Sequence, residues 1–446
     1  MKTTKSRQRS LTPPEAAERR YRPFMAWSVL ILLTVFMVLN FADRISLALA
    51  AQPLIKELHL SASQFGLISS SFYFLYSLSA VGIGFLATRH IPLKWLLFVM
   101  SLLWAATQLP VFMFAGGGML LGTRVGLGAA EGPATAVANS TAYSWFPPHR
   151  RGLPTAMLTS GASVAKLVAA PLLTLLIVHQ GWRSAFLALG IAALVWCAIW
   201  LLVGRTGPYL PVPAAPSVVR ENRAARRGTF LAVATSRTFI VLLLATYPMY
   251  ALISVILSWL PSYLEAGLGF SPLTSGVLFG LPSIIGMVFM LGAGWITDRL
   301  LAAGVPARVA RGLVPALSLA LGGILLTVLP LAGSQRYLAY ALLVGGYCLT
   351  LVAQPIVYAA IGTAAAPSQR TSVLSLFIAL QSTSGIVAPW VTGALVDTAG
   401  DRISGYNTAF LVLGALIAVG GLVAARLVDP GRDAAREAVM PPEPAG

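Results

Sequence analysis

Blocks of about 20 apolar residues, each separated from the next by a short polar break, recur along the whole of this 446-residue chain. Each block is long enough to cross a bilayer whose hydrocarbon core is about 30 Å thick. The pattern predicts twelve membrane-spanning helices, at residues 24–50, 65–88, 93–114, 117–140, 152–178, 183–203, 238–264, 272–297, 312–332, 337–362, 371–396 and 408–427. We therefore expect an all-α polytopic membrane protein.

The longest internal polar break divides the predicted spans into two groups of six. It covers residues 204–237, is rich in proline and arginine and has no apolar periodicity, so we expect a linker there. The two groups, 24–203 and 238–427, are expected to form two halves, flanked by tails at 1–23 and 428–446. Parallel repeats of six helices place a substrate site between the halves, near mid-membrane.

Composition supports the membrane assignment. The chain is 57% hydrophobic and only 10% charged, whereas soluble domains carry about 25% charged residues. Outside the spans, the tails, the linker and alternate loops hold 24 lysines and arginines, against four in the opposite loops. The positive-inside rule then predicts that both termini and the linker are cytoplasmic. Because this topology accounts for the net charge of +17, we expect no nucleic-acid partner.

The two halves carry similar loop sequences. Span 2 ends in GIGFLATR and span 8 in GAGWITDR. Together with twelve spans and a basic linker, these sequences resemble the major facilitator superfamily, which implies a fold of two pseudo-symmetric six-helix halves. In that family the G-x-x-x-D-R motif contributes to a cytoplasmic gate, which implies gating roles for Arg89, Asp298 and Arg299. Thr88 stands where the motif has aspartate, so the first-half gate should differ. The alternative for Asp298 and Arg299 is an ion pair that only holds helix ends.

Five charged side chains interrupt the apolar spans, and all of them belong to the first half: Asp43, Arg44, Arg124, Glu131 and Lys166. A charge at mid-bilayer costs about 2.5–3.5 kcal/mol, so these groups should face one another or a cavity. Arg124 and Glu131 are seven residues apart and should share one helix face, about 10.5 Å apart along the axis. Asp43 and Arg44 point about 100° apart, so one should face a neighbouring helix and the other the cavity.

Such a set of charges suits a carrier that couples protons to an anion. Burial favours the protonated form of a carboxylate and a nearby cation favours the ionised form, so proton and substrate each change the field felt by the other. A guanidinium binds a substrate carboxylate bidentately and remains charged. The three cations exceed the two acids, and an anionic ligand would neutralise the excess. The alternative is an ion-pair network that only locks helices together.

A second set of residues narrows the resemblance within the superfamily. Span 1 carries Asp43 and Arg44, span 2 carries Tyr76, and span 4 carries R-x6-E before the sequence SWFP. These residues resemble the anion:cation symporter family, which includes bacterial galactonate, hexuronate and phthalate carriers and, more distantly, sialin and the vesicular glutamate transporters. The resemblance implies that Asp43 and Glu131 couple protons, that Arg44 and Tyr76 contact substrate, and that Arg124 pairs with the span 1 acid. It also implies a bacterial inner membrane location.

The chain departs from galactonate-type carriers at two positions. Those carriers have Thr-Ser-Gly-Gln in span 5, with the glutamine contacting substrate, but here the motif ends at Ala162 and Lys166 lies one turn further on the same face. Ser382 falls where sugar-acid carriers have an asparagine that contacts substrate hydroxyls. These changes favour a more acidic, apolar or dicarboxylic substrate, with Lys166 either contacting it or balancing an acid. Gln354 and Gln381 are further polar residues that are expected to line the cavity.

Other functional classes are less compatible with the sequence. The four histidines lie in loops without metal-ligand spacing, and the two cysteines lie in separate spans, so we expect neither an enzyme nor a metal or cofactor. A drug/proton antiporter of the same superfamily is the main alternative, and a lysine in span 5 argues against the export of cations. A membrane sensor that does not transport is a further alternative. We expect a monomer that takes up a small organic anion together with protons, by alternating access.

Overall fold

The computed structural model describes residues 22–114, 116–147, 150–209, 233–306, 308–364 and 370–428, with only the backbone described at 81, 83–90, 362–364 and 370–372. All regular structure within these ranges is helical. The first half contains α2 (Pro23–Leu49), α3 (Ala51–Glu57), α4 (Ala62–His90), α5 (Leu93–Met113), α6 (Gly117–Glu131), α7 (Ala134–Trp145), α8 (Gly152–Val164), the π-helix η2 (Ala165–Ala169), α9 (Ala170–Gln180) and α10 (Arg183–Val203). The second half contains α13 (Arg237–Ser262), η3 (Tyr263–Gly267), α14 (Pro272–Ala302), η4 (Arg308–Leu313), α15 (Val314–Thr327), η5 (Leu329–Ala332), α16 (Arg336–Ala364), α17 (Arg370–Ser382), α18 (Ser384–Thr398) and α19 (Arg402–Leu427).

These helices occupy the twelve predicted spans. Ten spans, counted with their π-helical turns, are long and apolar enough to cross a membrane, and the other two correspond to α4 and to the pair α6–α7. Helix α19 begins at Arg402, before the predicted start at 408, because Asp401 caps it by accepting a hydrogen bond from the backbone N–H of Ser404 at 2.8 Å. The predicted tails and most of the predicted linker lie outside the described residues.

Several spans are interrupted near their own midpoints. The predicted fourth span divides into α6 and α7 at Gly132 and Pro133, where the proline lacks the N–H that would continue the helix. The fifth contains η2, and a short π-helical segment within an α-helix is frequently found at a functional site. The eleventh divides into α17 and α18 at Thr383. These breaks lie in the same spans as Glu131, Lys166 and Ser382.

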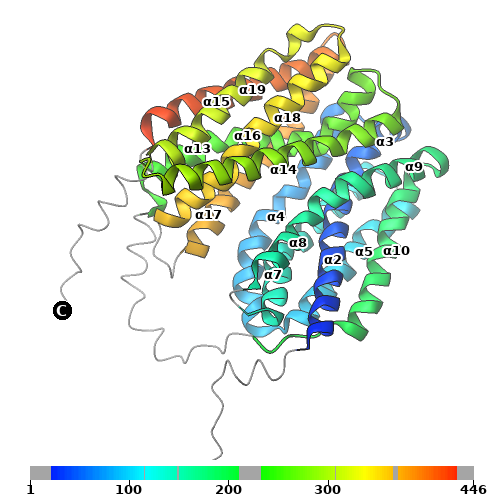
Figure 1. Ribbon diagram of the computed structural model, residues 1–446. Coiled ribbons are helices and arrows are strands. Elements are labelled where there is room, and N and C mark those ends of the chain that lie inside the picture. The colour runs from blue at the N-terminus through cyan, green and yellow to red at the C-terminus, as the bar shows by residue number, and fades with distance from the viewer. Residues whose placement is uncertain are drawn as a thin grey trace, which may run out of the picture.

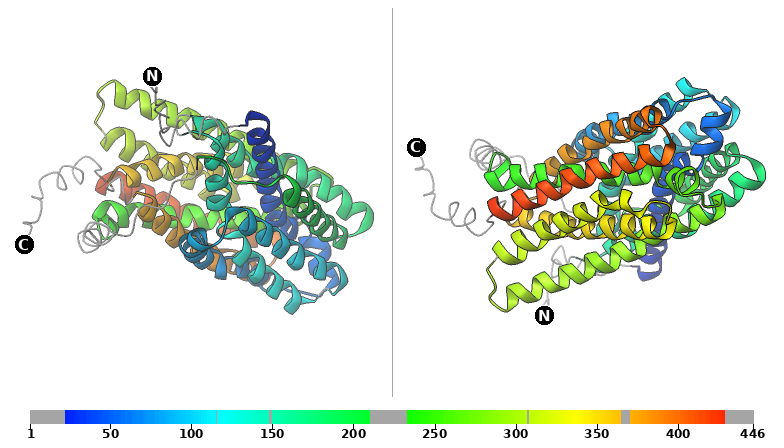
Figure 2. Two further views of the ribbon diagram at one scale, coloured as in Figure 1. Left: turned by 90° about the horizontal axis from the view of Figure 1, so that it is seen from below. Right: turned by 90° about the horizontal axis from the view of Figure 1, so that it is seen from above.

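The two halves lie side by side, the first half below the second in Figure 1, and both views in Figure 2 show the same division. Their main contacts join α4 to α18, α2 to α13, and α9 with η2 to α14. We call the side of the bundle where α2 begins and α19 ends the terminal side, and the opposite side, which carries α3, the far side. The halves meet on the far side and diverge toward the terminal side.

Hydrogen bonds across the far side hold the two halves together. The Asp397 carboxylate, on α18, accepts hydrogen bonds from the backbone N–H groups of Ala62 and Ser63 at the start of α4, at 2.8 and 2.7 Å. Arg402 donates to the side-chain oxygen of Gln52 at 2.9 Å. In the described part of the chain, no hydrogen bond between the halves lies closer to the terminal side than the pair Ser77 and Ser382. The halves are therefore closed against each other on the far side.

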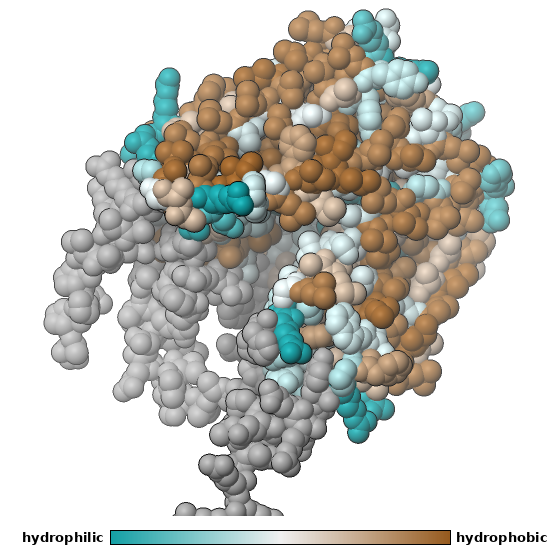
Figure 3. Space-filling model, in the orientation of Figure 1, coloured by the Kyte–Doolittle hydropathy of each residue, from teal (hydrophilic) through white to brown (hydrophobic). Residues whose placement is uncertain are grey.

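The outer surface is apolar. Figure 3 shows hydrophobic residues over most of one face, with hydrophilic residues gathered at its edges. Large side chains that soluble proteins bury lie exposed on the outer helices, among them Leu291 on α14 and Val419 on α19. Such a surface is suited to contact with lipid.

Candidate site in the first half

Arg44 and Glu131 form the central ion pair of the site. Arg44 donates from Nε and Nη2 to one carboxylate oxygen of Glu131, Oε2, at 3.1 and 2.8 Å. The other carboxylate oxygen, Oε1, is buried and accepts no hydrogen bond of good geometry, although the side chain of Asn40, whose amide nitrogen also lacks a partner, lies near this carboxylate. The side chain of Arg44 keeps 11% exposure whereas that of Glu131 has none. The cation of the pair is thus still accessible, and the acid is closed off behind it.

Aromatic rings surround the guanidinium of Arg44. Its central carbon lies 5.2 Å from the ring centroid of Phe41, 4.8 Å from that of Phe72 and 4.9 Å from that of Tyr76. Ring faces attract a cation and present an apolar wall, so they fix the guanidinium without neutralising it. Tyr76 therefore lies beside Arg44.

Asp43 points away from Arg44, toward α5. Its Oδ1 accepts a hydrogen bond from Nε2 of Gln108 at 2.8 Å, and its Oδ2 is buried without a partner. The divergence of Asp43 and Arg44 agrees with their adjacent positions on α2. Gln108 is a member of the site that the sequence reasoning missed, although an amide within the apolar span 93–114 was the signal for it.

Arg124 interacts electrostatically with the Asp43 carboxylate, the span 1 acid with which it was predicted to pair, but it forms no hydrogen bond or ion pair with that carboxylate. Arg124 donates instead to the main-chain carbonyl oxygen of Asp43 at 3.0 Å and to Oγ of Ser46 at 3.1 Å. The side chain of Arg124, on α6, is long enough to reach either a main-chain oxygen or a side-chain carboxylate of α2. Residue spacing does not distinguish these two targets. Arg124 is only 3% exposed, and its hydrogen bonds join α6 to α2.

The small residues of α6 bring it close to α4. A Cβ atom added at Gly128 would collide with the main-chain oxygen of Phe72, and one added at Gly132 would collide with α4 at Tyr76 and Ser79. This close approach places Glu131 within reach of Arg44 and the rings of α4. Glycine at position 128 is therefore what permits this close approach.

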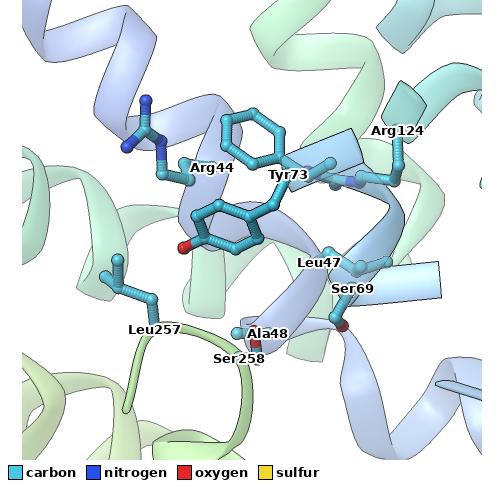
Figure 4. A pocket seen from close by; sticks show the side chains of 9 residues that line it. Arg44, Leu47, Ala48, Ser69, Tyr73, Arg124, Leu257 and Ser258 are labelled. Atoms are coloured by element: carbon cyan, nitrogen blue, oxygen red, sulfur yellow. The ribbon is translucent and has the colours of Figure 1, made fainter. Parts of the chain in front are cut away.

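A small pocket lies between Arg44 and Arg124. Both arginines line it, and the ring of Tyr73 lies between them in the view of Figure 4. Ser69 of α4 and Ser258 of α13 also line it, and Oγ of Ser69 is buried without a hydrogen-bond partner. Residues from both halves therefore line a small pocket of mixed polar and apolar character next to the charged network.

Lys166 lies in the π-helix η2, at the contact between the halves. Its electrostatic neighbours are Arg44 on α2 and Cys348 on α16, one from each half. Within the described residues its ammonium group forms no ion pair or hydrogen bond. The structure thus brings Lys166 toward the same interior as Arg44, without an acidic partner.

The second half contributes an uncharged polar wall. Gln354 donates to the Tyr358 hydroxyl at 3.1 Å, that hydroxyl donates to Oε1 of Gln381 at 3.0 Å, and Nε2 of Gln381 donates to the carbonyl oxygen of Thr246 at 3.2 Å. Gln381 is fully buried, so in this conformation both ends of its amide are occupied within the half. Tyr250 on α13 is an electrostatic neighbour of Arg44 that the sequence reasoning missed.

The remaining predicted site residues occupy separate places. The hydroxyl of Ser382 lies 2.6 Å from that of Ser77 on α4, so Ser382 sits between the halves. Asp298 and Arg299 are exposed and form no ion pair with each other, and the guanidinium of Arg299 lies 4.0 Å from the ring centroid of Trp295. The holding of helix ends by an Asp298–Arg299 ion pair is therefore not observed. The side chain of Arg89 lies outside the described residues.

This architecture, with two six-helix halves around a charged interior, defines a class of membrane transporter. The sequence profile of the Major Facilitator Superfamily matches residues 30–352, and the chain belongs to this superfamily. It is a multi-pass membrane transporter, and its relatives are transporters rather than enzymes.

Relatives with assigned functions match nearly the whole chain. A hexuronate transporter of Bacillus subtilis is 27% identical over 417 residues, covering 93% of this chain and 97% of the relative. A protein described as a probable sulfoacetate transporter of Cupriavidus necator is 26% identical over 410 residues, covering 90% and 93%. An MFS-type efflux pump of Mycolicibacterium smegmatis is 29% identical over 395 residues, covering 86% and 87%.

The fold also matches solved structures. A bacterial homologue of the human lysosomal transporter Spinster, in an inward-facing and unoccupied conformation, superposes with a TM-score of 0.78 at 18% identity, covering 93% of this chain and 99% of the homologue. This likeness confirms the predicted major facilitator fold.

Proposed function

We propose that this protein takes up a small organic anion together with protons, by alternating access, across a bacterial inner membrane. The observation that carries the proposal is Arg44, a partly accessible guanidinium paired with a buried acid at the contact between the halves. Relatives named for hexuronate and sulfoacetate transport are consistent with an anionic substrate. The excess of basic residues on the terminal side supports a cytoplasmic location for both termini.

The geometry suggests how substrate and proton are coupled. A substrate carboxylate and Glu131 would compete for Arg44, since the guanidinium can satisfy either one bidentately. Glu131 can accept a proton on Oε1 without losing a hydrogen bond, because that oxygen has no partner. Protonation would weaken its hold on Arg44 and release the guanidinium to the substrate. Asp43, with a free Oδ2, is the second proton-coupling acid of the proposal.

Other residues support this exchange. Tyr76 and Phe41 keep the guanidinium of Arg44 in place while its anionic partner changes. Arg124 holds α2 against α6 and contributes positive charge to the pocket beside Arg44. Ser382 lies where the second half meets the first. Gln381 packs behind that contact. We propose that they contact substrate after the halves rearrange.

The far-side contacts give the proposal a conformational setting. With the termini cytoplasmic, the present structure is closed toward the outside, the state from which substrate is released inward. In the opposite state, the terminal ends of the halves would come together, and we propose that Arg89, Asp298 and Arg299 act in that cytoplasmic closure.

Uptake into proteoliposomes tests the function. The purified protein would be reconstituted, an acidic exterior imposed, and labelled sugar acids, aromatic acids and dicarboxylates supplied outside. We expect at least one acid to accumulate above its equilibrium level and a protonophore to abolish that accumulation. The similarity to an efflux pump makes antiport the second candidate. Proton-driven movement of organic cations, with no response to any acid, would establish antiport and reject anion uptake.

A further inference from the structure

Lys166 faces the protein interior rather than lipid. Val164 and Val168, two residues before and after it, are 37% and 54% exposed on the outer surface. Residues two apart on a helix point in nearly opposite directions, so the side chain of Lys166 points inward. Its electrostatic neighbours, Arg44 and Cys348, agree with this direction.

The backbone around Lys166 is held at the contact between the halves. A Cβ atom added at Gly280 of α14 would lie 2.7 Å from the carbonyl oxygen of Lys166, so α14 can approach this closely only with glycine at that position. The same segment is π-helical, and a π turn shifts the direction of the side chains that follow it. Lys166 is thus fixed on the first half at a surface against which the second half packs.

Among the residues that the structure describes, no acidic side chain forms an ion pair with Lys166. Glu131 is engaged by Arg44, and Asp43 is engaged by Gln108. In the described part of the chain, neither acid forms an ion pair with the lysine. A charge within the membrane is expensive, by about 2.5–3.5 kcal/mol, unless it finds a partner. An anionic group of the ligand would supply such a partner.

We propose that Arg44 and Lys166 form a two-point anion site, and that the preferred substrate carries two anionic groups. The inference rests on the proposed uptake function and specifies its substrate class. With both acids ionised, the interior holds one excess positive charge, and each proton taken up adds another. Once one acid has taken up a proton, the excess is two positive charges. A dianion with one group on Arg44 and one on Lys166 neutralises it, whereas a monoanion leaves one charge uncompensated.

Paired substrates test this inference. Gluconate and glucarate share a six-carbon polyol chain, and glucarate adds a second carboxylate at the other end. Their affinities and uptake would be measured in proteoliposomes across pH. We expect the unaltered protein to prefer glucarate and Lys166→Gln to weaken glucarate selectively, by about tenfold or more relative to gluconate, the scale of one lost charged contact. Lys166→Arg should restore most of the preference.

Lys94→Gln is a matched control, because that lysine donates to the carbonyl oxygen of Leu201 at the surface. It should leave the ratio unchanged. If Lys166 only balances Asp43 or Glu131, its loss would shift the pH profile equally for both substrates with the ratio intact, and that result overturns the inference. A preference of the unaltered protein for gluconate also overturns it, whether or not the variants fold. Failure of every acid in the uptake panel to respond to a proton gradient would instead contradict the proposed function.

Discussion

Arg44 binds a single oxygen of Glu131 through two N–H groups, at 3.1 and 2.8 Å, and leaves the other oxygen of that carboxylate free. The pair is therefore not saturated. A proton can be added to the acid and an anion to the cation without first dismantling other contacts. This property separates a site that exchanges partners from an ion pair that only fastens two helices.

The first prediction concerns the two buried acids. Glu131→Gln and Asp43→Asn should each abolish accumulation driven by a pH gradient, because neither amide can gain or lose a proton. Exchange of labelled for unlabelled substrate should persist, since a neutral side chain resembles the protonated acid. Counterflow and gradient-driven uptake in the same proteoliposomes separate the two activities. Undiminished accumulation in both variants would remove these acids from proton coupling.

A second prediction concerns the guanidinium geometry of Arg44. Arg44→Lys keeps the charge but loses the fork, so substrate affinity should fall by about 1.5–3 kcal/mol, roughly 10- to 150-fold. Arg44→Ala should leave no measurable transport. Binding to the purified protein is the measurement, and Arg183→Lys on the far side is the control, because its partner Glu57 is exposed. Normal affinity in Arg44→Ala would mean that the anion binds elsewhere.

Glu57 provides a test of stability against pH. Glu57 lies on α3. Its carboxylate accepts hydrogen bonds from Nε1 of Trp182 and from Nη1 of Arg183, each at 2.6 Å. These hydrogen bonds lower its pKa below the ordinary value of 4.5. Because the folded-state pKa is lowered, the stabilisation is present at neutral pH and is lost as pH falls through that pKa.

We therefore expect Glu57→Gln to reduce the free energy of unfolding at pH 7, by no more than about 1 kcal/mol since the group is exposed. The deficit should shrink as the pH falls below 4.5 and through the lowered pKa of Glu57. Thermal unfolding of both proteins in detergent between pH 3 and pH 8 gives the comparison. A deficit that stayed constant with pH would show that charge on Glu57 is not its source.

Asp397 provides a prediction about conformation. Its carboxylate caps α4 from the opposite half, and loss of a helix cap costs about 0.5–2 kcal/mol. Asp397→Ala should therefore move the population toward the state that is open on the far side. Spin labels on Gln180 and Gly400, read by pulsed electron resonance, would report a longer distance in a larger fraction of molecules.

The control for this experiment is Asp401→Ala. Asp401 also caps a helix, but it accepts from Ser404 of its own helix α19 and joins nothing across the halves. Its loss should leave the distance distribution unchanged. Equal shifts in the two variants would point to general loosening instead of a contact between halves.

Most of the fold could be read from the sequence, because spans of about 20 apolar residues are a strong and regular signal. The boundaries that moved lie where polar residues extend a helix beyond the membrane, as Asp401 does for α19. The break at Pro133 was visible as a Gly-Pro pair, but its effect on a predicted continuous span depends on packing.

The sequence predicts which charged residues form the site, but not which groups they contact through hydrogen bonds and ion pairs. Charged residues are rare within apolar spans because burying a charge is costly. This rarity identifies Asp43, Arg44, Arg124 and Glu131. Which oxygen a guanidinium reaches depends on helix rotation and side-chain length, so the contact of Arg124 with a main-chain carbonyl could not be foreseen. Gln108 escaped notice because an uncharged amide is much less unusual in such a span.

The confinement of the interior charges to one half has an electrical consequence. Among the described spans, the second half carries no fixed charge away from its helix ends, so its rearrangement past the first half would carry no charge of its own across the membrane field. Moving one elementary charge through that field is worth about 2.3 kcal/mol per 100 mV. The voltage dependence of the cycle would then be set by the sum of substrate and proton charges alone. Uptake of a dianion with two protons would move no net charge across the membrane, and a third proton would make uptake generate a current.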